Sequence, residues 1–501
     1  MKIEKNLSFG MIEKISIMLC GFITRTCVIK FFGIDYVGLG TLFASILQIL
    51  NFAELGLESA IVFKLYSPVL NEDVNTINRL LNYYRKFCFA VGIIVSVVSF
   101  ALIPFLHLLI NGDVPNGINI YILFGINILN SIVGYFFYGY QSVLFSATGR
   151  LDVVSCISCI ISVLQCVFQV FSIINLHSYY VYALLVPAAT LSKLLVQHLF
   201  LKKQYSNYVP KGTITKEERR EIFAKIIGLL GYKINSIVVF SSDSIIISVF
   251  LGLSLLGKYN NYYYVITALN SIIIIILNSI KPHVGQSIAK YSCDRVYGEF
   301  KAITVIYVAI ISFFVSGLIA IFQDFIILWI GDDFLLKNSF VILLGVYFWV
   351  WKFLDIILLY QDASGIWNRN KTIPYIQALV NLTLNILFVQ YIGLYGIVLS
   401  TILSMLLVLV TVTKSVFKEC FLLDKIDKVY FYKIFVISII VIIVSYYSTR
   451  IVDYTIDSIL FRIFCKGILC LFSTIAIFWI MYFRNSNLLN MIKNRRKNKN
   501  V

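Results

Sequence analysis

The sequence predicts an all-helical polytopic membrane protein, and three observations support this prediction. Hydrophobic residues make up 59% of the 501 residues, and the mean hydropathy is +0.88. Charged residues make up 13%, about half of the roughly 25% that is typical of soluble domains. Apolar stretches of about 20 residues recur along the chain, and this is the length that a helix needs to cross a bilayer core of roughly 30 Å.

The hydropathy pattern predicts fourteen transmembrane spans. The polar start "MKIEKNLSFG" runs directly into the first span, which we expect to be an uncleaved anchor. The spans are expected at about 9–32, 37–63, 87–110, 119–145, 153–174, 180–201, 226–250, 259–280, 302–323, 338–360, 373–392, 395–413, 434–449 and 460–483.

Basic residues gather on one side of the predicted membrane. The N-terminus, every second loop and the tail hold about 32 of the 42 lysines and arginines. The opposite loops hold Lys258, Lys337 and Arg450. The positive-inside rule then predicts that both termini lie in the cytoplasm. The net charge of +17 is therefore interpreted as a topology signal, with a basic tail near anionic lipid, and nucleic-acid binding is not expected.

Three motif pairs predict an internal repeat, because each pair is separated by about 216 to 220 residues. An even number of spans per repeat gives both copies the same orientation, which predicts two six-helix lobes related by a pseudo-two-fold axis along the membrane normal. The pairs are "FFGIDYVGLG" (31–40) with "FLGLSLLGKY" (250–259), "LLINGD" (108–113) with "LWIGDD" (328–333), and "SATGR" (146–150) with "DASGI" (362–366).

The repeat divides the chain into four predicted parts. Residues 1–201 form the N-terminal lobe, 202–225 a charged cytoplasmic linker, and 226–416 the C-terminal lobe. Residues 417–501 hold two extra helices and a basic cytoplasmic tail. Paired repeats of this kind are typical of transporters that hold substrate between two lobes and alternate its access.

Charged residues inside the first two spans are the first candidate site residues. A charge at the centre of a membrane helix costs about 2.5–3.5 kcal/mol on insertion scales and usually faces a cavity or a partner. Arg25 lies well inside the first span, whereas Lys30 lies near its end and can extend to the interface. Glu54 and Glu58 share one face of the second span. Either glutamate could pair with Arg25 as a structural ion pair, or could bind a coupling proton or sodium ion.

The seventh span, "GYKINSIVVFSSDSIIISVFLG", carries a polar stripe of Lys233, Ser236, Ser244 and Ser248, with Asp243 beside it. Such a stripe predicts a water-filled path, although serine can also bond to its own backbone carbonyls.

The tenth span contains Lys352 and Asp355 three residues apart, so these two can neutralise each other. This pair can be structural or functional. Lys193 and Lys466 are single cations in the sixth and fourteenth spans, and we rank them below the other candidates.

Other motifs predict no chemistry of their own. Cys156 and Cys159 have CxxC spacing but lie in one membrane helix without a second ligand pair, so no metal or cofactor is predicted. The tyrosines in "YNNYYY" are interpreted as an interfacial aromatic belt. No segment outside the predicted membrane is long enough to hold a catalytic domain, so an enzyme such as a polymerase or glycosyltransferase is not expected.

Several segments give the chain a family resemblance. "AELGLESAIVFKLYSPV", "SSDSIIISVFLGLSLLGKYNNYYYVI", "FIILWIGDDFLL" and "IQALVNLTLNILFVQYIGLYGIVLSTILSM" resemble Wzx-type polysaccharide repeat-unit transporters of the multidrug/oligosaccharidyl-lipid/polysaccharide exporter superfamily. The resemblance covers most of residues 8–416.

The resemblance implies a flippase of the cytoplasmic membrane for undecaprenyl-pyrophosphate-linked oligosaccharide, which serves capsule, O-antigen or exopolysaccharide assembly. It implies that glycosyltransferases and a polysaccharide polymerase act beside the protein. Arg25, Lys233, Ser244, Ser248 and Lys352 are then the candidate substrate ligands. The candidate ion-coupling residues are Glu54, Glu58, Asp243 and Asp355. The alternative is a proton- or sodium-coupled small-molecule exporter of the same superfamily.

Overall fold

The computed structural model describes residues 2–51, 57–112, 114–115, 117–137, 139–366 and 370–483. These ranges are built from helices and contain no strand. The helices are α1 (Lys2–Phe31), α2 (Ile34–Leu50), α3 (Leu57–Leu70), α4 (Val74–Leu102), η2 (Ile103–Leu109), α5 (Ile120–Phe136), α6 (Gln141–Ala147), α7 (Leu151–Phe171), η3 (Ser172–Leu176), α8 (Tyr179–Gln204), α9 (Lys216–Leu251), α10 (Leu253–Lys290), α11 (Cys293–Ile330), η4 (Asp332–Phe334), α12 (Asn338–Ser364), α13 (Ile373–Ile392), α14 (Leu394–Glu419), α15 (Lys428–Thr455), α16 (Ile459–Phe478) and η5 (Trp479–Phe483).

The predicted class, an all-helical multi-pass membrane protein, is confirmed. In the described part of the chain, eleven helices are long and apolar enough to cross a bilayer, or twelve if α5 and α6, bent by 54°, count as one span. The helix α1 adds a further 30 residues but carries Glu13, Lys14, Arg25 and Lys30, so it is less apolar than those eleven. The predicted span 37–63 forms two helices, α2 and α3, on either side of residues 52–56, which lie outside the described residues.

Polar caps start several helices outside the apolar spans. The helix α4 begins at Val74, and its first turn is capped by Asp73, whose carboxylate accepts the N–H of Thr76 at 3.1 Å. Hydrogen bonds from the side chain and from the backbone N–H of Thr76 lower the pKa of Asp73. The helix α9 begins with a capping box in which Thr215 and Glu218 bond to each other's backbone N–H. Hydropathy does not register such caps, so both helices begin before the apolar spans that are predicted from 87 and 226.

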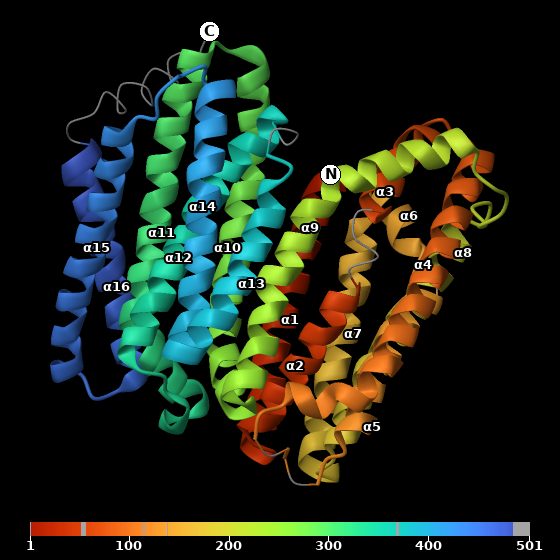
Figure 1. The fold of residues 1–501 in the computed structure, drawn as a ribbon, viewed down its shortest axis with the longest axis horizontal. Helices are drawn as coiled ribbons and strands as arrows, with labels where there is room; N and C mark the ends of the chain where they lie inside the picture. Colours follow the sequence, from red (N-terminus) through yellow and green to blue (C-terminus); the bar gives the residue numbers. More distant parts are fainter. Residues whose placement is uncertain are drawn as a thin grey trace. The chain divides into compact units, whose positions relative to one another are not determined.

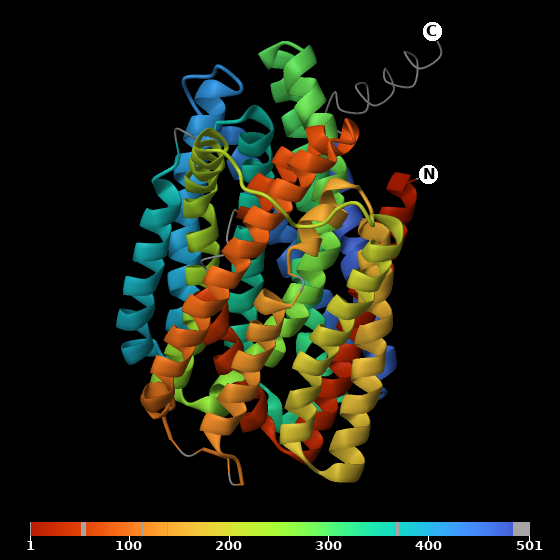
Figure 2. The ribbon, with the colours of Figure 1, turned by 90° about the vertical axis from the view of Figure 1, so that its right-hand side faces the viewer.

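The chain forms two compact units, Met1–Tyr262 and Tyr263–Val501. In the first unit, α1 packs along α7, and α7 and α5 both pack against α8 (Figures 1 and 2). The helix α9 packs on α2 and α3 of this same unit, although the predicted C-terminal lobe begins at 226. The predicted lobe boundaries stay a prediction.

The second unit is organised around α11. The helices α12, α15 and α16 all pack against it, and α13 and α14 form a hairpin beside α12. The two predicted extra helices are α15 and α16, which lie next to α11 as the blue pair in Figure 1. Buried amides join the hairpin, because the Asn381 side-chain NH2 donates to Thr401 Oγ1 at 3.1 Å.

Two glycines let α2 and α10 cross in close contact. A Cβ on Gly38 would lie 2.1 Å from the carbonyl oxygen of Leu253, and a Cβ on Gly257 would lie 2.5 Å from that of Ile34. The two contacts are equivalent in the repeat, because a shift of 219 positions carries Gly38 to Gly257 and Ile34 to Leu253. The repeat is therefore visible as a reciprocal contact, and each copy needs a glycine because a backbone oxygen fills the space of the missing side chain.

We expect Gly38→Ala to lower the stability of the protein by about 1–3 kcal/mol, because the added methyl group forces two backbones apart. Thermal unfolding of the purified protein in detergent measures this effect. Gly125→Ala in α5 is the matched control, since nothing lies within 4 Å of its Cβ position. An unchanged unfolding temperature for Gly38→Ala would contradict the close contact.

Candidate functional site

Arg25 is held by two neighbouring asparagines at the start of α10. Its Nη1 donates to the backbone oxygen of Asn260 and to Oδ1 of Asn261, both at 3.1 Å. Its Nη2 donates to Oδ1 of Asn260 at 2.6 Å. Amide and backbone oxygens are neutral acceptors, and these three bonds fix the plane of the guanidinium. The side chain is half-buried.

The amide of Asn261 has a second feature. Asn261 is fully buried, and its side-chain Nδ2 has no hydrogen-bond partner among the described residues. A buried donor without an acceptor is costly and commonly marks a place for water, an ion or a ligand. Tyr179 and Tyr182 of α8 lie within electrostatic range of Arg25. We call Arg25, Asn260 and Asn261 the Arg25 group, and it is suited to an anion with several acceptor oxygens.

The neighbouring tyrosines correct one sequence interpretation. Tyr259 and Tyr262 were expected in an interfacial belt, but both are buried inside the protein. The segment "YNNYYY" therefore directs polar side chains inward, and its two asparagines were missed because neutral amides do not stand out beside a run of aromatic residues.

The polar residues of α9 are largely buried. Asp243 and Ser244 are both buried, and Ser248 donates its hydroxyl to the backbone oxygen of Leu109 at 2.6 Å. Asn111 N–H in turn donates to the backbone oxygen of Ser248 at 3.1 Å. Ser248 therefore joins α9 to the segment around η2. The side chain of Lys233 lies outside the described residues.

The second predicted span contains two candidate glutamates, Glu54 and Glu58. Glu54 lies outside the described residues. Glu58 lies half-buried in the first turn of α3, where the positive end of the helix dipole favours an acid. The hydrogen bonds described for Arg25 go to Asn260 and Asn261.

Lys352 and Asp355 come together within the second unit. The Lys352 ammonium is fully buried and contacts Oδ2 of Asp355 at 2.6 Å and Oδ1 of Asn270 at 2.5 Å. It also lies over the ring of Trp351, 3.8 Å from the centroid. A lysine with these three contacts is neutralised and fixed, so its geometry fits the structural alternative.

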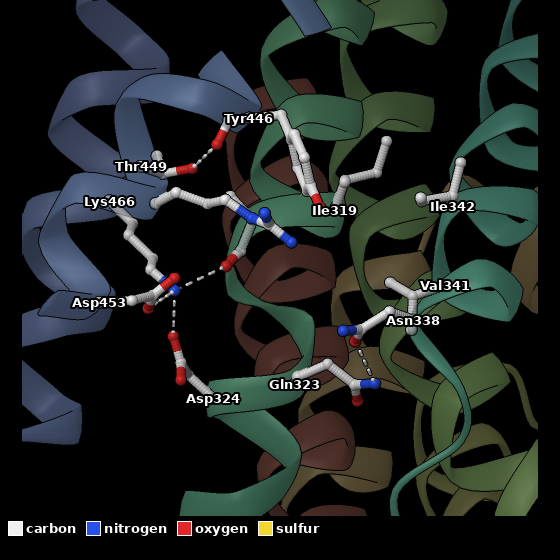
Figure 3. A pocket seen from close by; sticks show the side chains of 12 residues that line it. Ile319, Gln323, Asp324, Asn338, Val341, Ile342, Tyr446, Thr449, Asp453 and Lys466 are labelled. Carbon is white, nitrogen blue, oxygen red and sulfur yellow. Dashed lines mark hydrogen bonds and ion pairs between the residues drawn. The ribbon is translucent and has the colours of Figure 1, made fainter. Parts of the chain in front are cut away.

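A larger charged cluster lies elsewhere in the same unit, and only Lys466 of its members was considered from sequence. Lys466 lies between two carboxylates, 2.6 Å from Oδ2 of Asp324 and 2.6 Å from Oδ1 of Asp453 (Figure 3). Arg462 lies 3.3 Å from Oδ1 of Asp324 and 3.9 Å from Oδ1 of Asp453. We call these four residues the Lys466 cluster. It joins α11, α15 and α16.

No family model and no curated protein matches the chain. A solved lipid II flippase MurJ in an inward closed conformation matches with a TM-score of 0.69 and 14% identity, over 95% of this chain and 99% of that chain. An inward-facing multidrug resistance MATE family transporter of the MOP superfamily matches with a TM-score of 0.58 and 13% identity, over 81% of this chain and 95% of that one.

A third structure, a MOP superfamily transporter from Pyrococcus furiosus whose description reports a reverse polarity of the binding pocket, matches with a TM-score of 0.53 and 13% identity, over 81% of this chain and 93% of that one. At these identities the likeness establishes the fold. The chain therefore has the fold of these membrane transporters.

Proposed function

We propose that the protein is a flippase that moves an undecaprenyl-diphosphate-linked oligosaccharide across the cytoplasmic membrane, with both termini in the cytoplasm. The observation that supports this most is the Arg25 group. A diphosphate brings negative charge and several acceptor oxygens, so it can bond both to the guanidinium of Arg25 and to the buried Nδ2 of Asn261. The fold, which is also that of a lipid II flippase, supports a substrate carried on a lipid.

The other candidate residues take their roles in this proposal. Lys233 and Ser244 would contribute to the substrate path, with Ser248 bordering it. Glu54, Glu58 and Asp243 would couple transport to an ion, whereas Lys352 and Asp355 would form a structural ion pair. Two lobes that alternate in orientation would carry the polar glycan, while its apolar tail stays in the lipid. Glycosyltransferases would supply the substrate, and a polysaccharide polymerase would use the product.

Reconstitution tests the proposal directly. We expect proteoliposomes of the full-length protein to move a fluorescent undecaprenyl-diphosphate oligosaccharide between leaflets, as measured by its accessibility to a membrane-impermeant quencher. Protein-free liposomes are the first control. The undecaprenyl monophosphate form is the second, and it should move more slowly because it offers fewer acceptor oxygens.

One outcome separates this proposal from the alternative. If the lipid-linked sugar does not move but a proton or sodium gradient drives export of a small organic cation, the protein is an exporter and the flippase proposal is wrong.

A further inference from the structure

A polar cavity lies beside the Lys466 cluster, at one end of four helices. Its volume is about 170 Å3, and side chains from α11, α12, α15 and α16 line it (Figure 3). A single water needs only about 10–15 Å3 of such volume, so the cavity has room for a small polar group. Its lining includes Asp324, Asp453, Lys466 and Arg450, two acids and two bases.

The two buried charges of the lining pair with each other, and each has a further ionic partner in the Lys466 cluster. Lys466 and Asp324 are nearly inaccessible and form an ion pair at 2.6 Å. The other two charged residues of the lining, Arg450 and Asp453, are accessible, and Asp453 pairs with Lys466 and Arg462. Arg450 is exposed and lies over the ring of Tyr446, 5.0 Å from its centroid. The Asp453 side chain is 37% exposed, and the ion pairs described for it both use Oδ1, so Oδ2 can accept further hydrogen bonds.

Arg450 and Asp453 therefore present opposite charges side by side. They are three residues apart on α15, which places them on one face of the helix. A ligand that complements them carries an anionic and a cationic group a few ångströms apart. A purely anionic ligand would meet the Asp453 carboxylate, and like charges disfavour such a contact.

The position of the cavity and the side chains around it suit a membrane lipid. Asn338 is the first residue of α12, and Asp453 lies in the last turn of α15, so the cavity lies at the helix ends, where headgroups meet a membrane protein. Exposed apolar side chains continue from it along the same helix faces, with Val346 following Ile342 on α12 and Ile443 preceding Tyr446 on α15. Acyl chains can lie against these side chains.

We propose that this cavity, which we call the headgroup pocket, binds the headgroup of a zwitterionic aminophospholipid from the surrounding membrane. The phosphate contacts the guanidinium of Arg450, and the primary ammonium donates to Oδ2 of Asp453. A quaternary choline has no N–H to donate, so phosphatidylethanolamine binds more tightly than phosphatidylcholine. The lipid is a bound constituent at α15 and not the transported molecule, and the inference does not depend on the proposed function.

Native mass spectrometry of the full-length protein tests this inference. The protein is purified in detergent and mixed with equal amounts of phosphatidylethanolamine, phosphatidylcholine and phosphatidylglycerol. We expect phosphatidylethanolamine to be retained preferentially. Arg450→Gln should weaken its retention about tenfold, the effect of losing one charge-assisted hydrogen bond. Asp453→Asn should remove the preference over phosphatidylcholine.

Lys428→Gln is the matched control, because it removes the same charge from an exposed residue at the opposite end of α15. This variant should retain phosphatidylethanolamine as strongly as the wild type does. Asp453 also pairs with Lys466, so the unfolding temperature of Asp453→Asn is measured in parallel, and Arg450→Gln decides the outcome if Asp453→Asn unfolds. Three results would each overturn the proposal. The wild type could retain phosphatidylglycerol as strongly as phosphatidylethanolamine or more strongly, it could retain the two zwitterionic lipids equally, or Arg450→Gln could retain phosphatidylethanolamine as strongly as the wild type.

Discussion

Replacing Lys466 with methionine is expected to destabilise the protein by about 3 kcal/mol. Removing one member of a buried ion pair typically costs about 3–5 kcal/mol, because the other charge stays buried without its partner. Here Asp324 is the charge left behind, and it is buried. Arg462 lies 3.3 Å from its other oxygen, so part of the charge stays compensated and the loss falls at the lower end of the range. Unfolding in mixed micelles of rising dodecyl sulfate content measures it.

Lys281→Met provides the matched control for this experiment. It breaks the ion pair of Lys281 with Asp362 at 2.9 Å, but the two side chains are 48% and 39% exposed, and exposed pairs contribute only about 0–1 kcal/mol. Adding Asp324→Asn to Lys466→Met should recover part of the lost stability, because the buried charge is then removed. If Lys466→Met unfolds like Lys281→Met, the cluster does not hold α16 against α11.

The two acids of this cluster, Asp324 and Asp453, escaped the sequence analysis for a physical reason. The predicted spans end at 323 and 449, so Asp324 and Asp453 counted as loop residues. In the structure α11 continues to Ile330 and α15 to Thr455, and both acids lie within helices facing Lys466. Hydropathy averages cannot extend a helix through charged residues, because the partner that makes the charge tolerable comes from another helix far away in the sequence.

The sequence was more informative about the helices and the repeat. The predicted span 373–392 coincides with α13 (Ile373–Ile392), because Pro374 at the start and Gly393 after the end limit the helix locally. The glycines of "FFGIDYVGLG" and "FLGLSLLGKY" predicted equivalent positions, and Gly38 and Gly257 occupy reciprocal contacts. These features depend on residues that are close together in the chain, so a single sequence is enough to predict them.

The candidate site was predictable only in part. Arg25 stands out because an arginine within an apolar span requires an explanation. Its partners do not stand out, because Asn260 and Asn261 lie 235 and 236 residues away and asparagine in a membrane helix is ordinary. The packing of distant helices decides which acceptors contact a cation, so the residues close to the cation in the sequence do not reveal its partners.

Replacing Arg25 with glutamine is expected to slow translocation of the diphosphate-linked oligosaccharide by about 10- to 100-fold. A hydrogen bond to a charged group contributes about 1.5–3 kcal/mol, and each 1.4 kcal/mol corresponds to a factor of ten. Arg25→Lys should recover only part of the rate, since an ammonium keeps the charge but lacks the planar fork that Asn260 and Asn261 hold in place. The quencher assay in proteoliposomes measures the rates.

The comparison with Lys30 separates a binding role from a general effect of charge. Lys30 lies on the same helix, is exposed, and is expected to reach the membrane interface. The Lys30→Gln variant should therefore translocate the oligosaccharide within about twofold of the wild-type rate, because surface substitutions usually change free energies by less than about 0.5 kcal/mol. Because Arg25 also joins α1 to α10, the unfolding temperature of each variant is measured beside its rate. A folded Arg25→Gln variant that translocates at the wild-type rate would remove Arg25 from the substrate site, while equal losses for the diphosphate and monophosphate lipids would make its role one of positioning α10.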